Sequence, residues 1–156
     1  MRHPTSTSFI TPVKSDGVVQ TESAVEFGRG SFTLVAGATY YFPIGGQDCT
    51  RLSGHMHWDA AIILTSVTVE DCNMPPSEVA DYVASTGGQW IDEDPTTAFV
   101  GVKGAGVTVS SGVVAASGGA LGGCMFHIDT GARRTRLAVV VGGTGGEVRC
   151  AAWGKE

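Results

Sequence analysis

Apolar and polar residues alternate along much of the chain, in short runs separated by glycine-rich turns. Leu137 and Val139 share one face of the strand predicted for residues 134–141, and Arg134 and Arg136 lie on the other. Similar runs recur along the sequence and are rich in β-branched residues, which favour strands. Strands are predicted for residues 31–35, 39–44, 57–69, 97–103, 106–109, 113–116, 124–128, 134–141 and 147–153.

A helical pattern occurs in residues 75–83. Pro75 and Pro76 stand where a first helical turn tolerates proline, and Val79 and Val83 share a face at helical spacing. The pattern predicts one short helix or helical turn here, ended by the following glycines.

Seven to nine short strands with almost no helix indicate an all-β fold. We expect a two-sheet β-sandwich of the jelly-roll or Greek-key type, because two sheets can bury one apolar face each against the other. Residues 25–156 form this single domain, and residues 1–24 form an extended N-terminal arm.

The arm has few large apolar residues, which are Phe9, Ile10, Val13, Val18 and Val19. Fixing the backbone costs roughly 1–2 kcal/mol per residue, which so little apolar surface cannot offset. We therefore expect the arm to be poorly ordered in the free chain and to become ordered on a neighbouring chain. It has no apolar stretch of the kind that a secretory signal contains.

Composition excludes several classes of protein. The 156 residues carry a formal net charge of −5, so a broad basic surface for nucleic acid is not expected. Charged residues make up 16% and hydrophobic residues 42%, a balance that argues against general disorder. Apolar runs such as residues 60–64 are too short to span a bilayer, so no membrane partner is expected.

The four cysteines are widely spaced and form no C-x-x-C pair, which argues against a structural zinc site. They permit two disulfides in three pairings, or four free thiols. Without a secretion signal, buried free thiols are favoured, with Cys150 facing the core beside Val148 and Ala152. The cysteines are Cys49, Cys72, Cys124 and Cys150.

Catalytic motifs are not completed. The glycines of residues 142–146 lack the Lys-Ser/Thr of a Walker loop, and no G-x-S-x-G elbow occurs. His55, His57 and Asp59 would share one face of a strand, so a zinc or iron site is an alternative to solvated histidines. Solvated histidines are the favoured reading, and no catalytic residue, metal or cofactor is expected.

Two charge clusters of opposite sign stand out in a weakly charged chain. They are either solvated loops or a contact between subunits, where complementary charge mainly gives specificity and on-rate. A head-to-tail oligomer would need two such different patches. The candidate contact residues are Asp92, Glu93 and Asp94 in one cluster and Arg133, Arg134 and Arg136 in the other.

The chain from about residue 30 onward resembles small β-sandwich virion proteins of tailed bacteriophages. The resemblance lies in the spacing of the strands and in composition, at residues 58–61, 65–70, 89–95, 134–137 and 147–155. It implies a non-enzymatic structural component of a phage particle, such as a capsid decoration (cement) protein. It implies location in the virion after assembly in the host cytoplasm, a major capsid protein or other virion protein as partner, and a homo-oligomer, with a trimer as the expected number.

Three other functions remain open. One is a tail or fibre component. Another is a glycan- or receptor-binding sandwich, for which the candidate aromatic residues are Tyr40, Tyr41, Trp90 and Trp153. The third is a metal-dependent enzyme that uses the two histidines and the aspartate described above.

Overall fold

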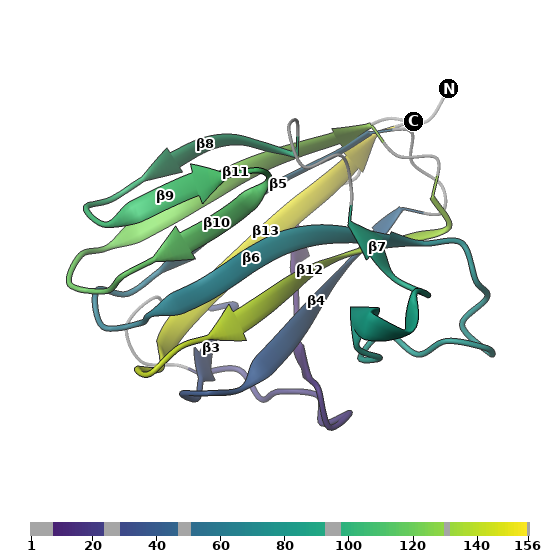
Figure 1. Ribbon diagram of the computed structural model, residues 1–156, viewed down its shortest axis with the longest axis horizontal. Coiled ribbons are helices and arrows are strands. Elements are labelled where there is room, and N and C mark those ends of the chain that lie inside the picture. Colours follow the sequence, from purple (N-terminus) through teal and green to yellow (C-terminus); the bar gives the residue numbers. More distant parts are fainter. Residues whose placement is uncertain (1–7, 24–28, 47–50, 93–97, 130–131, 156) are drawn as a thin grey trace.

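A computed structural model describes residues 8–23, 29–46, 51–92, 98–129 and 132–155, and they fold into two antiparallel β-sheets packed face to face (Figure 1). The predicted β-sandwich is confirmed. Sheet A contains β1 (Ser8–Phe9), β3 (Ser31–Leu34), β5 (Arg51–Trp58), β8 (Phe99–Lys103), β11 (Gly122–Asp129) and β13 (Gly146–Lys155). Sheet B contains β2 (Val13–Lys14), β4 (Thr39–Gly46), β6 (Leu64–Cys72), β7 (Ile91–Asp92), β9 (Val107–Ser110), β10 (Val113–Ala116) and β12 (Arg134–Val141).

Strands far apart in the sequence lie side by side in both sheets. Sheet A has the order β1-β13-β5-β11-β8, with β3 also paired to β13. Sheet B has the order β2-β4-β12-β6-β10-β9, and β7 pairs with the end of β6. The C-terminal strands β12 and β13 are therefore central, and each is held between earlier strands.

The core lies between the sheets and takes one residue in two from most long strands, as the alternation predicts. Its largest fully buried apolar side chains include Tyr40, Phe42, Met56, Trp58 and Phe126. Gly54 of β5 faces Phe126 of β11 in register, and the ring of Phe126 fills the space that a side chain at position 54 would need. No helix of the described residues is long and apolar enough to cross a membrane.

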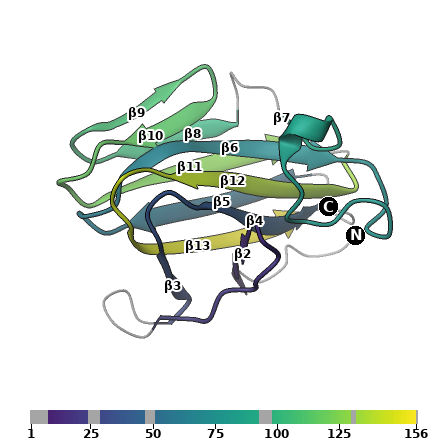
Figure 2. The same ribbon diagram turned by 60° about the horizontal axis from the view of Figure 1, so that its bottom comes forward.

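The N-terminal segment differs from the extended arm that we expected. Within its described part, residues 8–23, β1 pairs with β13 and β2 pairs with β4, so the segment extends both sheets of its own chain at one edge (Figure 2). Pro12 is buried between these two short strands. Residues 1–7 lie outside the described residues.

The single strand predicted for residues 57–69 is wrong, because the chain turns at residues 59–63 and passes from β5 in sheet A to β6 in sheet B. Asp59 makes this turn. Its Oδ1 accepts hydrogen bonds from the amides of Ala61 (3.0 Å) and Ile62 (3.1 Å), and its Oδ2 accepts one from Glu147 (2.8 Å). An aspartate that binds nearby amides in this way competes with a sheet ladder.

Residues 75–83, for which one short helix or helical turn was predicted, form no α-helix but contain a helical turn, in which the carbonyl of Pro75 accepts hydrogen bonds from the amides of Glu78 (2.9 Å) and Val79 (3.2 Å). The segment consists of turns, and a short 3₁₀ helix, η1 (Ser85–Gly87), follows it. The carbonyl groups of Val79, Asp81 and Val83 accept hydrogen bonds from arginine side chains of β12. Beyond its own turn hydrogen bonds, the segment is thus held by side chains of sheet B.

Candidate contact surfaces

Arg136 is a fully buried cation at the outer face of sheet B. Its Nε and Nη2 both lie 2.9 Å from Oε1 of Glu70, the residue opposite it on β6. Its guanidinium lies 3.8 Å from the ring centroid of Tyr41 and 3.9 Å from that of Trp90, so it is sandwiched between two aromatic rings. Burial lowers the pKa of Arg136, and Glu70 opposes that shift.

Arg134, two residues earlier, binds the same segment. It donates to Oδ1 of Asp81 (2.7 Å) and to the carbonyl oxygens of Val79 (2.7 Å) and Met74 (3.2 Å). The two arginines therefore fasten residues 73–90 onto the end of sheet B, over a small apolar cluster that contains Cys72, Val79 and Trp90.

These contacts change the expected basic cluster. Arg136 has no exposed surface and Arg134 is largely covered, because both side chains are used inside the chain. They are not available to another subunit, and the expectation that they form an exposed contact patch is wrong. Arg133 is exposed, and its amide donates to Asn73 (2.9 Å).

The acidic cluster is exposed where it is described. Asp92 ends β7 and is exposed, and Ile91 beside it has 64% of its surface exposed. Glu93 and Asp94 lie outside the described residues. The structure therefore does not bring the two predicted clusters together as a pair.

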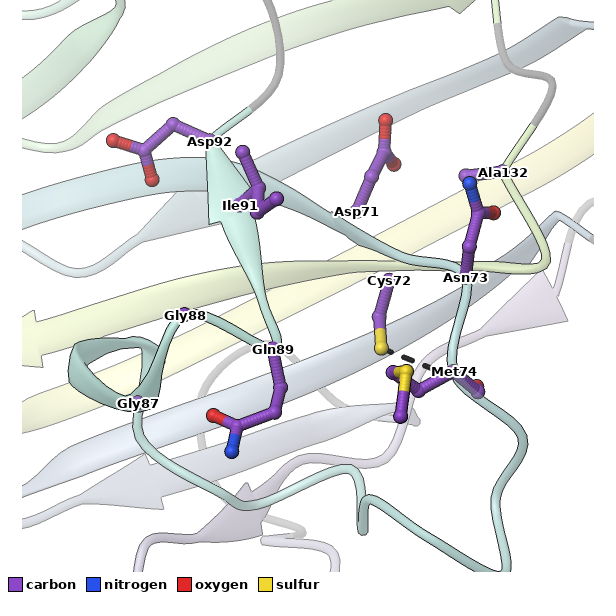
Figure 3. Close-up of a pocket in the computed structure, with 10 residues that line it drawn as sticks. All are labelled: Asp71, Cys72, Asn73, Met74, Gly87, Gly88, Gln89, Ile91, Asp92 and Ala132. Atoms are coloured by element: carbon purple, nitrogen blue, oxygen red, sulfur yellow. Dashed lines mark hydrogen bonds between the residues drawn. The ribbon is translucent and has the colours of Figure 1, made fainter.

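A cavity of about 610 Å³ lies between β7 and the end of β6 (Figure 3). Asp71 faces it and accepts a hydrogen bond from Thr135 (2.7 Å), while Cys72 and Met74 line its other side. Gln89 also lines it, and Oε1 of that amide is buried without a partner among the described residues. Ile91 and Asp92 project at its rim.

The outer face of sheet A carries a second candidate surface, across β13, β5 and β11. His55 pairs with Met125 and Ala151 in one row, and the next row contains Ser53, His127 and Trp153. Ser53 Oγ lies 2.7 Å from His127 Nδ1, and Arg51 forms an ion pair with Asp129 at 3.0 Å. This face was not predicted as a contact surface, although the alternation of polar and apolar residues in β5 indicates it.

A groove of about 630 Å³ lies on this face where β8, β11 and β5 meet. Gly123 pairs with Lys103 on one side and with His57 on the other, and a Cβ at this position would lie 2.9 Å from the carbonyl oxygen of Met56 and 3.3 Å from Cβ of His57. Leu121 (64% exposed) and Met125 (46% exposed) line the groove along the chain. The result is an apolar groove with one lysine and two imidazoles at its sides.

Asp59 does not join the two histidines as a third ligand of the metal site that the sequence allowed. His55 and His57 are neighbours, with ring centroids 5.5 Å apart, but Asp59 is occupied by backbone amides. No group of three or more potential ligands that could hold a metal ion occurs among the described residues. Partial burial lowers the pKa of His57, and His55 and Arg149 lower it further.

The predicted burial of the thiols is confirmed for Cys72, Cys124 and Cys150, which are free. Cys150 faces the core with Val148 and Ala152, as predicted. Burial raises the pKa of Cys124 to about 12 and also raises that of Cys150. Cys49 lies outside the described residues.

Three of the four aromatic residues proposed for glycan binding are core residues. Tyr40, Tyr41 and Trp90 are buried, and the latter two flank Arg136. Trp153 is half-buried on the outer face of sheet A. An aromatic platform of the expected kind is therefore not formed by these side chains.

Comparison of the chain with models of protein families, with curated proteins and with solved structures finds no match.

Proposed function

We propose that this protein is a non-enzymatic structural component of a bacteriophage particle, a capsid decoration protein that acts through contacts between subunits. Its partners are further copies of itself and the major capsid protein or another virion protein. The observation that carries the proposal is the outer face of sheet A, which combines a regular strand surface with exposed apolar side chains and a groove.

The size of this face supports a contact with a protein. Four strands about 4.8 Å apart, with about eight residues each at ~3.3 Å, cover roughly 500 Å² of flat area, against about 800 Å² per partner in a standard interface. Side-chain relief adds to the accessible area. The face is therefore of the order of size that one subunit presents to another.

The chemistry of the face also supports a contact. Met125, Leu121 and Phe9 are exposed apolar residues of sheet A and the turn before β11, and Arg149 lies over the ring of Phe9 at 4.2 Å. Contiguous exposed apolar groups rimmed by polar ones mark surfaces that bind other proteins, and Leu121 and Met125 line one groove together. A well-packed sandwich provides the rigid support that such a surface needs.

The proposal is tested on phage particles purified from the source of the gene. Immunogold labelling with antibody to this chain should decorate the particle heads, and mass spectrometry of the particles should find the chain in many copies. A chain that is absent from purified particles would overturn the proposal. Gold on the tail alone would mean that the chain is a tail or fibre component and not a capsid protein.

A further inference from the structure

The groove of sheet A and the tip of β7 offer apolar and charged groups that complement each other. The groove is lined by the apolar side chains of Leu121 and Met125, and Lys103 places a cation at its side. The tip of β7 offers one exposed apolar side chain, Ile91, followed by the carboxylate of Asp92. In the sequence, two more acidic residues come next.

These two features cannot meet within one chain. β7 pairs with Glu70 and Asp71 at the C-terminal end of β6, in sheet B. The groove lies beside the β8–β9 turn and the start of β11, at the other end of the sandwich and in the other sheet (Figure 1). A contact between them therefore joins two molecules.

We propose that the tip of β7 in one copy docks into the groove of sheet A in a second copy. Ile91 enters the groove between Leu121 and Met125, and Asp92 lies beside Lys103. The contact uses different patches on the two copies, so it repeats head to tail and closes into a ring if the rotation allows. The idea deepens the proposed function, because it names the surface through which the subunits contact each other.

Charge complementarity favours this occupant over a small ligand or a basic partner. The chain carries a net charge of −5, yet Lys103 places a positive charge at the border of the groove. The acidic end of the same chain is the surface that such a groove attracts. The same logic underlies the expected contact of opposite charge clusters, with the basic partner now on sheet A instead of on β12.

The test measures self-association by sedimentation velocity and light scattering on the full chain. Removing the apolar side chain with Ile91→Ser should weaken association roughly thirtyfold, the loss expected for one buried aliphatic side chain. Val109→Ser is the matched control, since Val109 is also an exposed β-branched strand residue and lies outside the groove. It should leave association unchanged.

Charge reversal identifies the pairing. Asp92→Lys or Lys103→Glu alone should weaken association about fivefold, and the double variant should recover most of that loss. Gly101→Gln should block the groove without disturbing the fold, because a Cβ at that position meets only Met125 Cε at 3.8 Å. Gly143→Gln, at an open turn position outside the groove, is its control.

The outcomes separate the contact from the function. A wild-type chain that stays monomeric at 100 µM (a concentration that populates contacts of about 10⁻⁴ M or tighter), or an oligomer that Ile91→Ser and Gly101→Gln leave intact, overturns the docking proposal. If such a chain is still found on phage heads, the proposed function stands and the docking proposal alone falls. If the variants weaken an oligomer of the chain but the chain is absent from phage particles, the docking proposal is supported and the proposed function is overturned.

Discussion

At the scale of single residues, the least expected feature is a buried ion pair. Arg136 and Glu70 face each other across β12 and β6, and both side chains are almost completely withdrawn from water. A buried charge is costly unless it is paired and hydrogen-bonded, and here the guanidinium also binds the carbonyls of Asp81 and Val83. The pair thus ties the 73–90 segment to the sheet.

Removing one residue of the Arg136–Glu70 ion pair should lower the free energy of unfolding more than removing both residues. Arg136→Met leaves the Glu70 carboxylate buried without its cation, and it should lower the free energy of unfolding by about 3–5 kcal/mol. The double variant Arg136→Met, Glu70→Leu should lose less, because no charge stays buried. Urea denaturation followed by tryptophan fluorescence measures both, and a single variant within 1 kcal/mol of wild type would contradict the prediction (about a third of the smallest expected effect).

The buried thiols make stability depend on alkaline pH. Burial holds the pKa of Cys124 at about 12 and also raises that of Cys150, so both thiols stay protonated in the folded chain when an unfolded chain would already release the protons. The unfolded state then binds fewer protons, and the free energy of unfolding falls as the pH rises above about 9, by up to about 1.4 kcal/mol per pH unit for each thiol.

Cys124→Ala should remove the contribution of one thiol and make this fall less steep. The measurement is the free energy of unfolding between pH 8 and pH 10.5, compared for wild type and variant. Equal slopes for the two chains would show that Cys124 is not the titrating group.

At the scale of elements, β5 and β11 are held together by a glycine that faces an aromatic ring. A Cβ at position 54 would lie 2.1 Å from Cζ of Phe126, and this ring is buried and packed edge-to-face on Phe99. The ring has no room to withdraw. Gly54→Ala should therefore lower the free energy of unfolding by about 1–3 kcal/mol, the usual cost of overpacking.

Gly101→Ala on the neighbouring strand β8 is the matched control, because the added methyl group meets only Met125 Cε at contact distance. It should leave stability close to that of wild type. Thermal or urea unfolding of the two variants side by side makes the comparison, and equal effects would mean that Phe126 can move aside.

The elements themselves were predictable where alternation decides burial. The alternation in residues 134–141 correctly predicted β12. The apolar residues Val148, Cys150 and Ala152, at every second position, correctly predicted the face of β13 that lies in the core. The break at Asp59 was not predicted, since an aspartate turn inside an apolar run depends on amides that include the distant Glu147. The helical turn at residues 75–79 does not continue as a helix for a similar reason, because the carbonyls that follow are bound by arginines more than fifty residues later.

The candidate surfaces were only partly predictable for the same reason. The sequence marks Asp92 and the arginines as charged clusters, but burial of Arg136 depends on Glu70, Tyr41 and Trp90, which come from three separate segments. The groove depends on Gly123 lying between Lys103 and His57 on neighbouring strands. No local pattern contains a juxtaposition of this kind.

At the scale of the whole molecule, the sandwich has two different ends. β7 lies at one end and the β8–β9 turn at the other (Figure 1). β7 carries the exposed Asp92, and the β8–β9 turn borders the apolar groove that contains Lys103. The arginine-fastened segment of residues 73–90 lies next to the tip of β7 and helps to hold it in place. A rigid body with one projecting patch and one receiving patch is suited to repeated contacts of one kind.

Cross-linking between two variants that each carry one added cysteine tests this arrangement most directly. Both are made in a Cys49→Ser background and keep Cys72, Cys124 and Cys150, which are buried. Ile91→Cys and Leu121→Cys place one thiol on the tip of β7 and one at the groove. When the two variants are mixed and oxidised mildly, a disulfide-linked dimer should form, whereas each variant alone should stay monomeric on a non-reducing gel. No dimer in the mixture, or equal dimer in the unmixed samples, would contradict a head-to-tail contact between the two ends.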